Sequence, residues 1–284
     1  MNYNKAFKTQ QGRDEVLKYY DLLLEELTIP FEKVNINTRY GNTFLITAGD
    51  ISSQPMVLLH GSSMNSSMWI SDIMKYSQRY RVYAIDMPGE PGRSDERQFP
   101  FTTSDLEEWL YNVFIELSIN KAVVIGASLG AWLATKFAIR YPEKVDKLVL
   151  LCPAGIGTQN KKFIFTALFH MLFGEKGIRR LFKKINGDVD MPEIILNYQR
   201  VITQNFNSRR EPIPIFSDDD IRLLTMPVIL FVGVKDIILN SIETADRLKK
   251  LIPEARINVF PDKGYSIINV NDTILCLLYT SPSP

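Results

Sequence analysis

The chain has 284 residues, 45% of them hydrophobic and 23% charged, with a formal net charge of +1 at pH 7. Such a chain can bury a sizeable core, which excludes disorder as its main state. Its near-neutral charge also excludes binding to nucleic acid or to an anionic membrane that depends on bulk charge alone.

Two features of the sequence bear on its cellular compartment. Residues 1–20 carry charges throughout and lack the apolar region of a secretory signal, and no apolar run approaches the roughly 18 residues of a membrane span. The two cysteines, Cys152 and Cys276, form no disulfide framework, which suits a reducing environment. We therefore expect a cytoplasmic protein with no stable membrane insertion and no nucleic-acid partner.

The first predicted element is an amphipathic helix. Apolar residues recur at helical spacing over residues 14–27, and Pro30 ends the pattern. We interpret residues 1–30 as a helical flap docked on the rest of the chain. Two strand-like runs, 31–37 and 43–48, follow and are joined by a Tyr-Gly-Asn turn, so we expect a hairpin.

After this hairpin, short apolar runs alternate with helical patterns. The predicted strands are residues 56–59, 82–85, 122–125, 148–151, 228–232 and 257–260, and the predicted helices include 106–117, 131–139 and 241–251. Near-continuous apolar strands separated by helices are typical of a mostly parallel, doubly wound α/β sheet. The long interval between the fourth and fifth of these strands predicts a helical insertion at 155–217, which leaves 31–154 and 218–275 as the core.

The C-terminal residues 276–284, CLLYTSPSP, differ in character from the rest of the chain. They resemble the translated end of an adapter used for sequencing libraries. We therefore expect these residues to be non-native, the natural chain to continue beyond Leu275, and its last helix to be missing here. A natural Ser/Pro tail is the alternative.

A candidate nucleophile follows the strand at residues 122–125. The sequence AVVIGAS leads into Gly126-Ala127-Ser128-Leu129-Gly130 and then into a helical pattern. A serine on so sharp a strand-to-helix turn needs small neighbours, because the flanking glycines come close to adjacent backbone. The alternative is a Gly-rich turn without chemistry.

With this motif the sequence resembles the α/β-hydrolase superfamily from about residue 38 to 272. His60-Gly61-Ser62-Ser63 follows a strand like the oxyanion loop of that family, residues 86–94 are similar to its D-x-P-G-x-G-x-S segment with one extra residue, and YPEKV at 141–145 matches its YPE-V. Within the superfamily, the chain looks most like capped bacterial carboxylesterases. The resemblance implies an α/β-hydrolase fold with a helical cap.

The same resemblance implies specific roles in the site. Ser128 would be the nucleophile, and the backbone amides of Ser62 and Leu129 would form the oxyanion hole. Asp236, at the end of the strand 228–232, would be the acid that orients an imidazolium; a turn or helix-cap aspartate is the alternative. We expect His60 to brace the oxyanion loop, and Asp86 and Ser94 to form loops rather than to catalyse.

The expected catalytic histidine is absent. Tyr265 stands where the family places it, after the strand 257–260. A neutral phenol cannot take the proton of Ser128 at pH 7 as imidazole does. Three origins of Tyr265 stay open: a sequence error through a C-to-T change, a damaged allele, or a noncatalytic descendant. His170 lies in an apolar helical pattern, where packing is the expected role.

The predicted insertion is rich in basic and aromatic residues. Residues 161–184 carry seven basic side chains against one acidic. This segment could lie on a membrane surface, but we favour a cap in which Phe165, Phe169 and Met171 contact an apolar substrate. No metal-ligand cluster, P-loop or G-x-G-x-x-G occurs, so no cofactor or metal is expected.

Together these features predict a carboxylic ester hydrolase that acts on small apolar esters through a serine acyl-enzyme and is impaired by Tyr265. A noncatalytic protein that binds a ligand in the capped pocket is the alternative. A cofactor-free oxygenase or an acyltransferase would use the same scaffold. An epoxide hydrolase is disfavoured because it needs a carboxylate where Ser128 stands.

Overall fold

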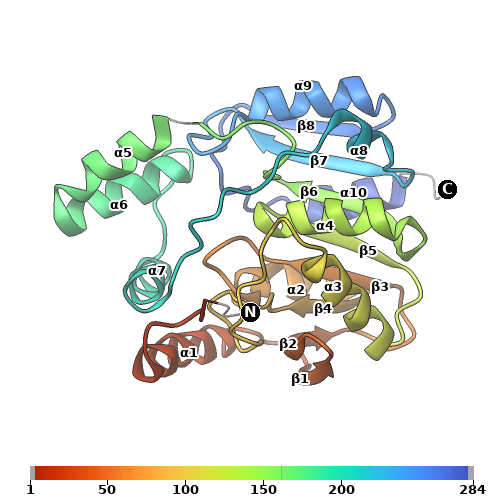
Figure 1. Ribbon diagram of the computed structural model, residues 1–284, viewed down its shortest axis with the longest axis horizontal. Helices are drawn as coiled ribbons and strands as arrows, with labels where there is room; N and C mark the ends of the chain where they lie inside the picture. The colour runs from red at the N-terminus through yellow and green to blue at the C-terminus, as the bar shows by residue number, and fades with distance from the viewer. Residues whose placement is uncertain (1–3, 161, 281–284) are drawn as a thin grey trace.

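A computed structural model of the chain describes residues 4–160 and 162–280 (Figure 1). Within these residues, eight strands form one sheet in the order β1-β2-β4-β3-β5-β6-β7-β8. The strands are β1 Phe31–Thr38, β2 Gly41–Ala48, β3 Pro55–Leu59, β4 Arg81–Ile85, β5 Ala122–Ala127, β6 Val145–Leu151, β7 Val228–Gly233 and β8 Arg256–Phe260. The hairpin β1–β2 and the pair β2–β4 are antiparallel, and every other neighbouring pair is parallel.

Helices cover both faces of this sheet. On one face, Val57, Val124 and Leu230 pack with the helices α3, α4 and α9; on the other, Leu58 and Ile125 pack with α1, α2 and α10. The helix bounds are α1 Gln10–Leu24, α2 Ile70–Tyr76, α3 Asp105–Glu116, α4 Leu129–Arg140, α8 Asp218–Arg222, α9 Ser241–Leu251 and α10 Asn271–Thr280. Because side chains alternate along a strand, burial on both faces explains the near-continuous apolar runs. The predicted α/β-hydrolase fold is confirmed.

The N-terminal helix α1 packs against the core. Tyr20 is fully buried, and its hydroxyl donates to Oδ1 of Asp86 at 3.0 Å. The ring of Tyr19 stacks on the ring of Tyr198, which lies on the helix α7 Glu193–Asn205 beside α1 (Figure 1). The same Asp86 carboxylate accepts the amides of Ser66 and Arg93, so one buried acid ties α1 to two loops.

The insertion after β6 contains three helices, α5 Lys162–Met171, α6 Gly174–Ile185 and α7 Glu193–Asn205. Figure 1 shows α5 and α6 as a hairpin beside the sheet, with α7 near α1. Residues 206–217, which we call the return segment, form no helix and lie against the core. There the carbonyl of Pro214 accepts the indole N–H of Trp132 at 3.1 Å. The boundaries 155–217 for a separate cap stay a prediction.

The C-terminal residues 271–280 form a helix, α10, which includes Cys276. Leu278 is 2% exposed, and its carbonyl accepts the ammonium of Lys147 at 2.7 Å. That residues 276–284 are non-native and that the natural chain continues beyond Leu275 stay predictions. Residues 281–284 of that predicted tail lie outside the described residues.

The docking of α1 can be tested at its buried phenol. Tyr20→Phe removes a hydrogen bond to a buried carboxylate, so we expect the free energy of unfolding to fall by about 2 kcal/mol. Tyr19→Phe is the matched control and should change it by less than about 0.5 kcal/mol, because no hydrogen bond of its hydroxyl is described. Urea denaturation measures both, and equal effects at the two positions would contradict the docking role of Tyr20.

Candidate active site

Ser128 sits on a strained turn between β5 and α4. Its backbone has φ 51° and ψ −107°, an unusual conformation for a residue with a Cβ. A Cβ on Gly126 would lie 2.4 Å from the carbonyl oxygen of Gly130, and one on Gly130 would lie 2.1 Å from that of Leu59. Both positions therefore require glycine. The amide of Ser128 donates to the carbonyl of Leu151 at 2.9 Å, which fixes the turn against β6.

The two expected oxyanion donors flank this serine. Leu129 is the first residue of α4, so its amide has no acceptor within its own helix. On the other side, a Cβ on Gly61 would lie 3.7 Å from the Cβ of Ser128, which brings the Gly61–Ser62 peptide beside the nucleophile. Among the described residues, no protein acceptor is recorded for the amides of Ser62 and Leu129. Two uncommitted donors near one hydroxyl are what an oxyanion hole needs.

His60 braces the loop that carries Ser62. Its Nε2 accepts the amide of Met87 at 2.9 Å, so Nδ1 carries the proton and donates to the carbonyl of Gly61, also at 2.9 Å. Burial lowers the pKa of His60, against the effect of Asp86, and keeps the ring neutral. Both ring nitrogens are thus committed to backbone, which gives His60 a structural role.

Tyr265 makes direct contact with the nucleophile. Its phenol donates a hydrogen bond to Oγ of Ser128, and its amide donates to the carbonyl of Ile185 at 2.8 Å. Burial raises the pKa of Tyr265 above its ordinary value, and the nearby Cys152 and Asp236 raise it further. A phenol with a raised pKa stays protonated at neutral pH. Tyr265 therefore acts as a donor to Ser128 and cannot accept its proton.

Asp236 lies at the end of β7, where the sequence placed it, but it is engaged locally. Oδ1 accepts the amides of Ile238 at 2.7 Å and Leu239 at 2.9 Å, and Oδ2 accepts the hydroxyl of Ser241 at 2.8 Å. Burial raises the pKa of Asp236, while these three hydrogen bonds oppose the shift. No hydrogen bond between Asp236 and Tyr265 is recorded in the described structure. The relay from serine to acid therefore stops at the phenol.

The aromatic residues expected to contact substrate lie on the exposed surface of α5. Phe165 is 75% exposed and Phe169 is 58% exposed, and the ring of Phe169 packs on Phe173 and on His170 within the same insertion. The side chain of Met171 lies outside the described part of the structure. His170 is buried, and its Nδ1 bonds to the carbonyl of Thr166 at 2.8 Å, which fits the packing role expected for it.

Sequence reasoning missed three residues near this site. Cys152 is 3% exposed and has φ 42°. Burial, and then the nearby Asp236, raise the pKa of Cys152, which in turn raises the pKa of Tyr265. Glu90 and Arg209 form an ion pair with side chains only 1% and 7% exposed. The extra residue in the segment 86–94, which contains Glu90, was the one available signal. Nothing in the sequence connects Glu90 with Arg209.

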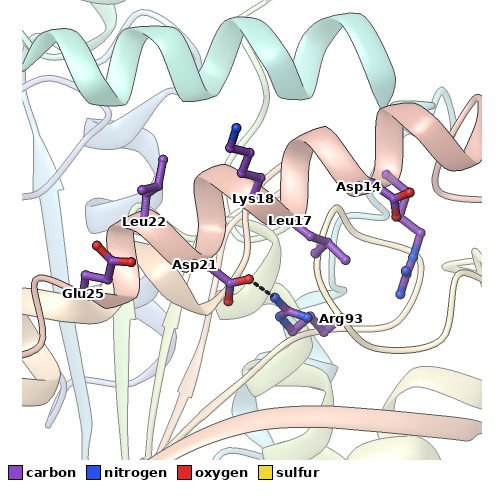
Figure 2. Close-up of a pocket in the computed structure, with 8 residues that line it drawn as sticks. Asp14, Leu17, Lys18, Asp21, Leu22, Glu25 and Arg93 are labelled. Carbon is purple, nitrogen blue, oxygen red and sulfur yellow. Dashed lines mark hydrogen bonds and ion pairs between the residues drawn. The ribbon is translucent and has the colours of Figure 1, made fainter.

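We also searched the described residues for metal sites, membrane-spanning helices and other hollows. Among the described residues, no group of three or more His, Cys, Asp or Glu side chains could hold a metal ion, and no helix is long and apolar enough to cross a membrane. A hollow of about 510 Å³ along α1 is lined mainly by charged side chains, of which Asp21 and Arg93 pair at 2.6 Å (Figure 2). None of the predicted site residues lines that hollow.

Comparison with known proteins shows which sequences this chain is similar to. The family profile described as "alpha/beta hydrolase fold" matches residues 54–180. A Bacillus subtilis (strain 168) protein named "Uncharacterized carboxylesterase nap" is 28% identical over 274 residues, which cover 92% of this chain and 91% of its own length. "Carboxylesterase YbfK" of the same strain is 26% identical over 254 residues, 87% of this chain and 86% of its own.

Two solved structures have the same architecture. The crystal structure of naproxen esterase (carboxylesterase NP) from Bacillus subtilis has a TM-score of 0.84 at 24% identity, over 95% of this chain and 99% of that chain. Carboxylesterase CesB (YbfK) from Bacillus subtilis also has a TM-score of 0.84, at 25% identity, over 96% of this chain and 100% of that chain. The likeness extends through the core and the insertion.

The protonation state of Tyr265 is directly measurable. An ultraviolet difference titration between the unmodified chain and Tyr265→Phe isolates this phenol. We expect it to remain protonated beyond the pH of about 10 at which a free tyrosine ionises, because burial disfavours the phenolate. N-acetyl-tyrosinamide is the reference compound. Ionisation of Tyr265 near pH 10 would mean that solvent reaches the phenol and that burial does not set its pKa.

Proposed function

We propose that this chain, which has the α/β-hydrolase fold and is similar over most of its length to carboxylesterases of Bacillus subtilis, carries a serine-esterase site for small apolar carboxylic esters in which Tyr265 replaces the general base. One observation carries the proposal: Tyr265 hydrogen-bonds the hydroxyl of Ser128 from the position that a catalytic base would occupy.

The proposed chemistry needs one group that the chain lacks. Ser128 would attack the ester carbonyl, the amides of Ser62 and Leu129 would stabilise the oxyanion, and an acyl-enzyme would form. Attack requires an acceptor for the hydroxyl proton, and Tyr265 is itself a protonated donor there. Loss of the base costs on the order of a millionfold in turnover in a serine protease. The chain as it stands is therefore a slow or inactive esterase.

The proposed substrate class follows from the insertion. The exposed aromatic rings of Phe165 and Phe169 offer apolar area that an acyl or alkyl group would bury, and Met171 lies on the same helix. The Bacillus relatives are named carboxylesterases, which supports the choice of ester over amide or epoxide. We assign small apolar carboxylic esters as substrates, with the cap residues as the acyl-binding surface.

A second function fits the contact between Ser128 and Tyr265. Because the Ser128 hydroxyl already accepts a hydrogen bond from the phenol of Tyr265, the site presents a neutral pair of hydroxyl groups to a ligand instead of a nucleophile. A noncatalytic protein that binds an apolar carboxylic ester or acid in the same pocket would keep this pair and lose turnover.

The two functions separate at residue 265. Tyr265→His places an acceptor beside Ser128, so we expect aryl-butyrate hydrolysis to rise by roughly a thousandfold or more over the unmodified chain. Steady-state release of the aryl alcohol measures it. Tyr265→Phe is the matched control and should stay inactive, because it removes the phenol without adding a base.

Two further variants test the assigned roles in the Tyr265→His background. Ser128→Ala should abolish the gained activity. Asp236→Asn should reduce it by up to roughly ten-thousandfold, because the imidazole loses the group that orients it. If Tyr265→His gives no turnover, while a butyrate ester raises the melting temperature of the unmodified chain, the ligand-binding function holds and the esterase proposal fails.

A further inference from the structure

A buried carboxylate contacts the loop that carries the oxyanion donor Ser62. The side chain of Glu90 is 1% exposed, and its Oε2 accepts the amide of Ser63 at 2.7 Å. Ser63 has φ 57°, a left-handed conformation that a non-glycine residue rarely adopts. A charge-assisted hydrogen bond to this amide offsets part of that strain. Glu90 therefore holds Ser63 in a conformation that the isolated loop would disfavour.

Ser62 lies between two peptide groups that are each fixed by a buried side chain. The carbonyl of Gly61 belongs to the same peptide plane as the amide of Ser62, and it accepts Nδ1–H of His60 at 2.9 Å. Glu90 fixes the next peptide plane through the amide of Ser63. Because a peptide is planar, the His60 contact sets the direction of the Ser62 N–H, and the Glu90 contact restricts the rotation between that plane and the next about the φ and ψ of Ser62.

Glu90 is in turn held by the return segment of the insertion. Oε1 of Glu90 pairs with Nε of Arg209 at 3.2 Å. The guanidinium also donates to the carbonyls of Phe99 at 2.7 Å and Pro88 at 3.3 Å, and it lies 4.9 Å from the centroid of the Phe101 ring. A buried carboxylate is costly unless it is paired. Arg209 supplies that pair and joins the insertion to the oxyanion loop.

We propose that Glu90 is a positioning residue, which aims the Ser62 amide at the developing oxyanion, and that Arg209 couples this amide to the insertion. This inference rests on the proposed esterase function. Glu90 does not touch the substrate; it acts through the backbone of Ser63. An oxyanion donor is effective only at close range, and a small displacement of it lowers turnover without weakening the binding of the substrate.

The kinetic test uses the Tyr265→His variant as the parent. Burial raises the pKa of Glu90 to about 7, so the assay is run well above that pH, where the carboxylate is charged. There Glu90→Gln removes the charge and weakens the hold on Ser63, so we expect kcat for an aryl butyrate to fall by roughly 10- to 100-fold with KM changed by less than about threefold. Glu107→Gln is the matched control, because Glu107 on α3 is also buried, with its side chain 4% exposed, and pairs with Lys136 on α4 at 3.0 Å. Its kcat should stay within about threefold of the parent. Equal losses in both variants would reduce Glu90 to a general stabilising residue and overturn the inference.

A second measurement does not depend on activity. In the chain with its own Tyr265, hydrogen exchange of the peptide spanning residues 60–66 should accelerate in Glu90→Gln and remain unchanged in Glu107→Gln. Arg209→Lys serves as a second variant in case Glu90→Gln folds poorly. It keeps the positive charge but loses the forked contacts of the guanidinium, so exchange of the same peptide should be faster than in the unmodified chain and slower than in Glu90→Gln. If Tyr265→His lacks activity, the esterase proposal fails while this measurement still decides on Glu90. Unchanged exchange in Glu90→Gln and Arg209→Lys would overturn the positioning role.

Discussion

The close approach of α4 to β3 is the constraint on which the rest of the structure depends. The backbone at Gly130 leaves no room for a Cβ beside the carbonyl of Leu59, and two residues earlier Ser128 has a strained conformation at the end of β5. This strain is sustained because β5 lies in the middle of the sheet, paired with β3 on one side and β6 on the other. The carboxyl ends of these parallel strands meet at one edge, so the loop after β3, the turn after β5 and the segment after β7 all reach the same place. The position of the nucleophile is therefore a property of the sheet rather than of the turn alone.

Around this turn, the chain retains the groups that position a reaction and lacks the group that starts it. In the proposed roles, Ser128 and the amides of Ser62 and Leu129 lie together, whereas Asp236 is engaged locally and Tyr265 donates a hydrogen bond to Ser128 where an acceptor would be needed. The substitution is compatible with the fold because a phenol, like an imidazole, fills an apolar space and ends in a polar atom. It is incompatible with proton transfer because burial keeps that phenol neutral. The local hydrogen bonds of Asp236 leave the acid stable without a histidine partner.

The insertion is joined to the core at more than one point, and this affects how it would act on a ligand. The carbonyl of Ile185, at the end of α6, accepts the amide of Tyr265, and Arg209 of the return segment pairs with Glu90 beside the oxyanion loop. The hairpin α5–α6, by contrast, carries exposed aromatic side chains such as Phe165. A ligand that contacts this hairpin would thus touch a surface that adjoins the segments bonded to Tyr265 and Glu90. Among the contacts that join the insertion to the core, the one between Tyr265 and Ile185 is a backbone hydrogen bond, and the one between Arg209 and Glu90 is a side-chain ion pair.

The sequence by itself determined the fold class and the positions of the strands along the chain, because parallel strands buried on both faces leave near-continuous apolar runs that are visible without coordinates; their order in the sheet came from the structure. It also determined the elbow at Ser128, since the flanking glycines follow from local backbone crowding, and the absence of a histidine at residue 265. It did not predict α10, whose packing depends on contacts of Leu278 with distant parts of the chain. Only the tertiary structure decided that Tyr265 hydrogen-bonds Ser128, that Asp236 is engaged locally, and that Glu90 meets Arg209 from a segment far along the chain. These are contacts between side chains brought together by the sheet, and periodicity and local spacing carry no information about them.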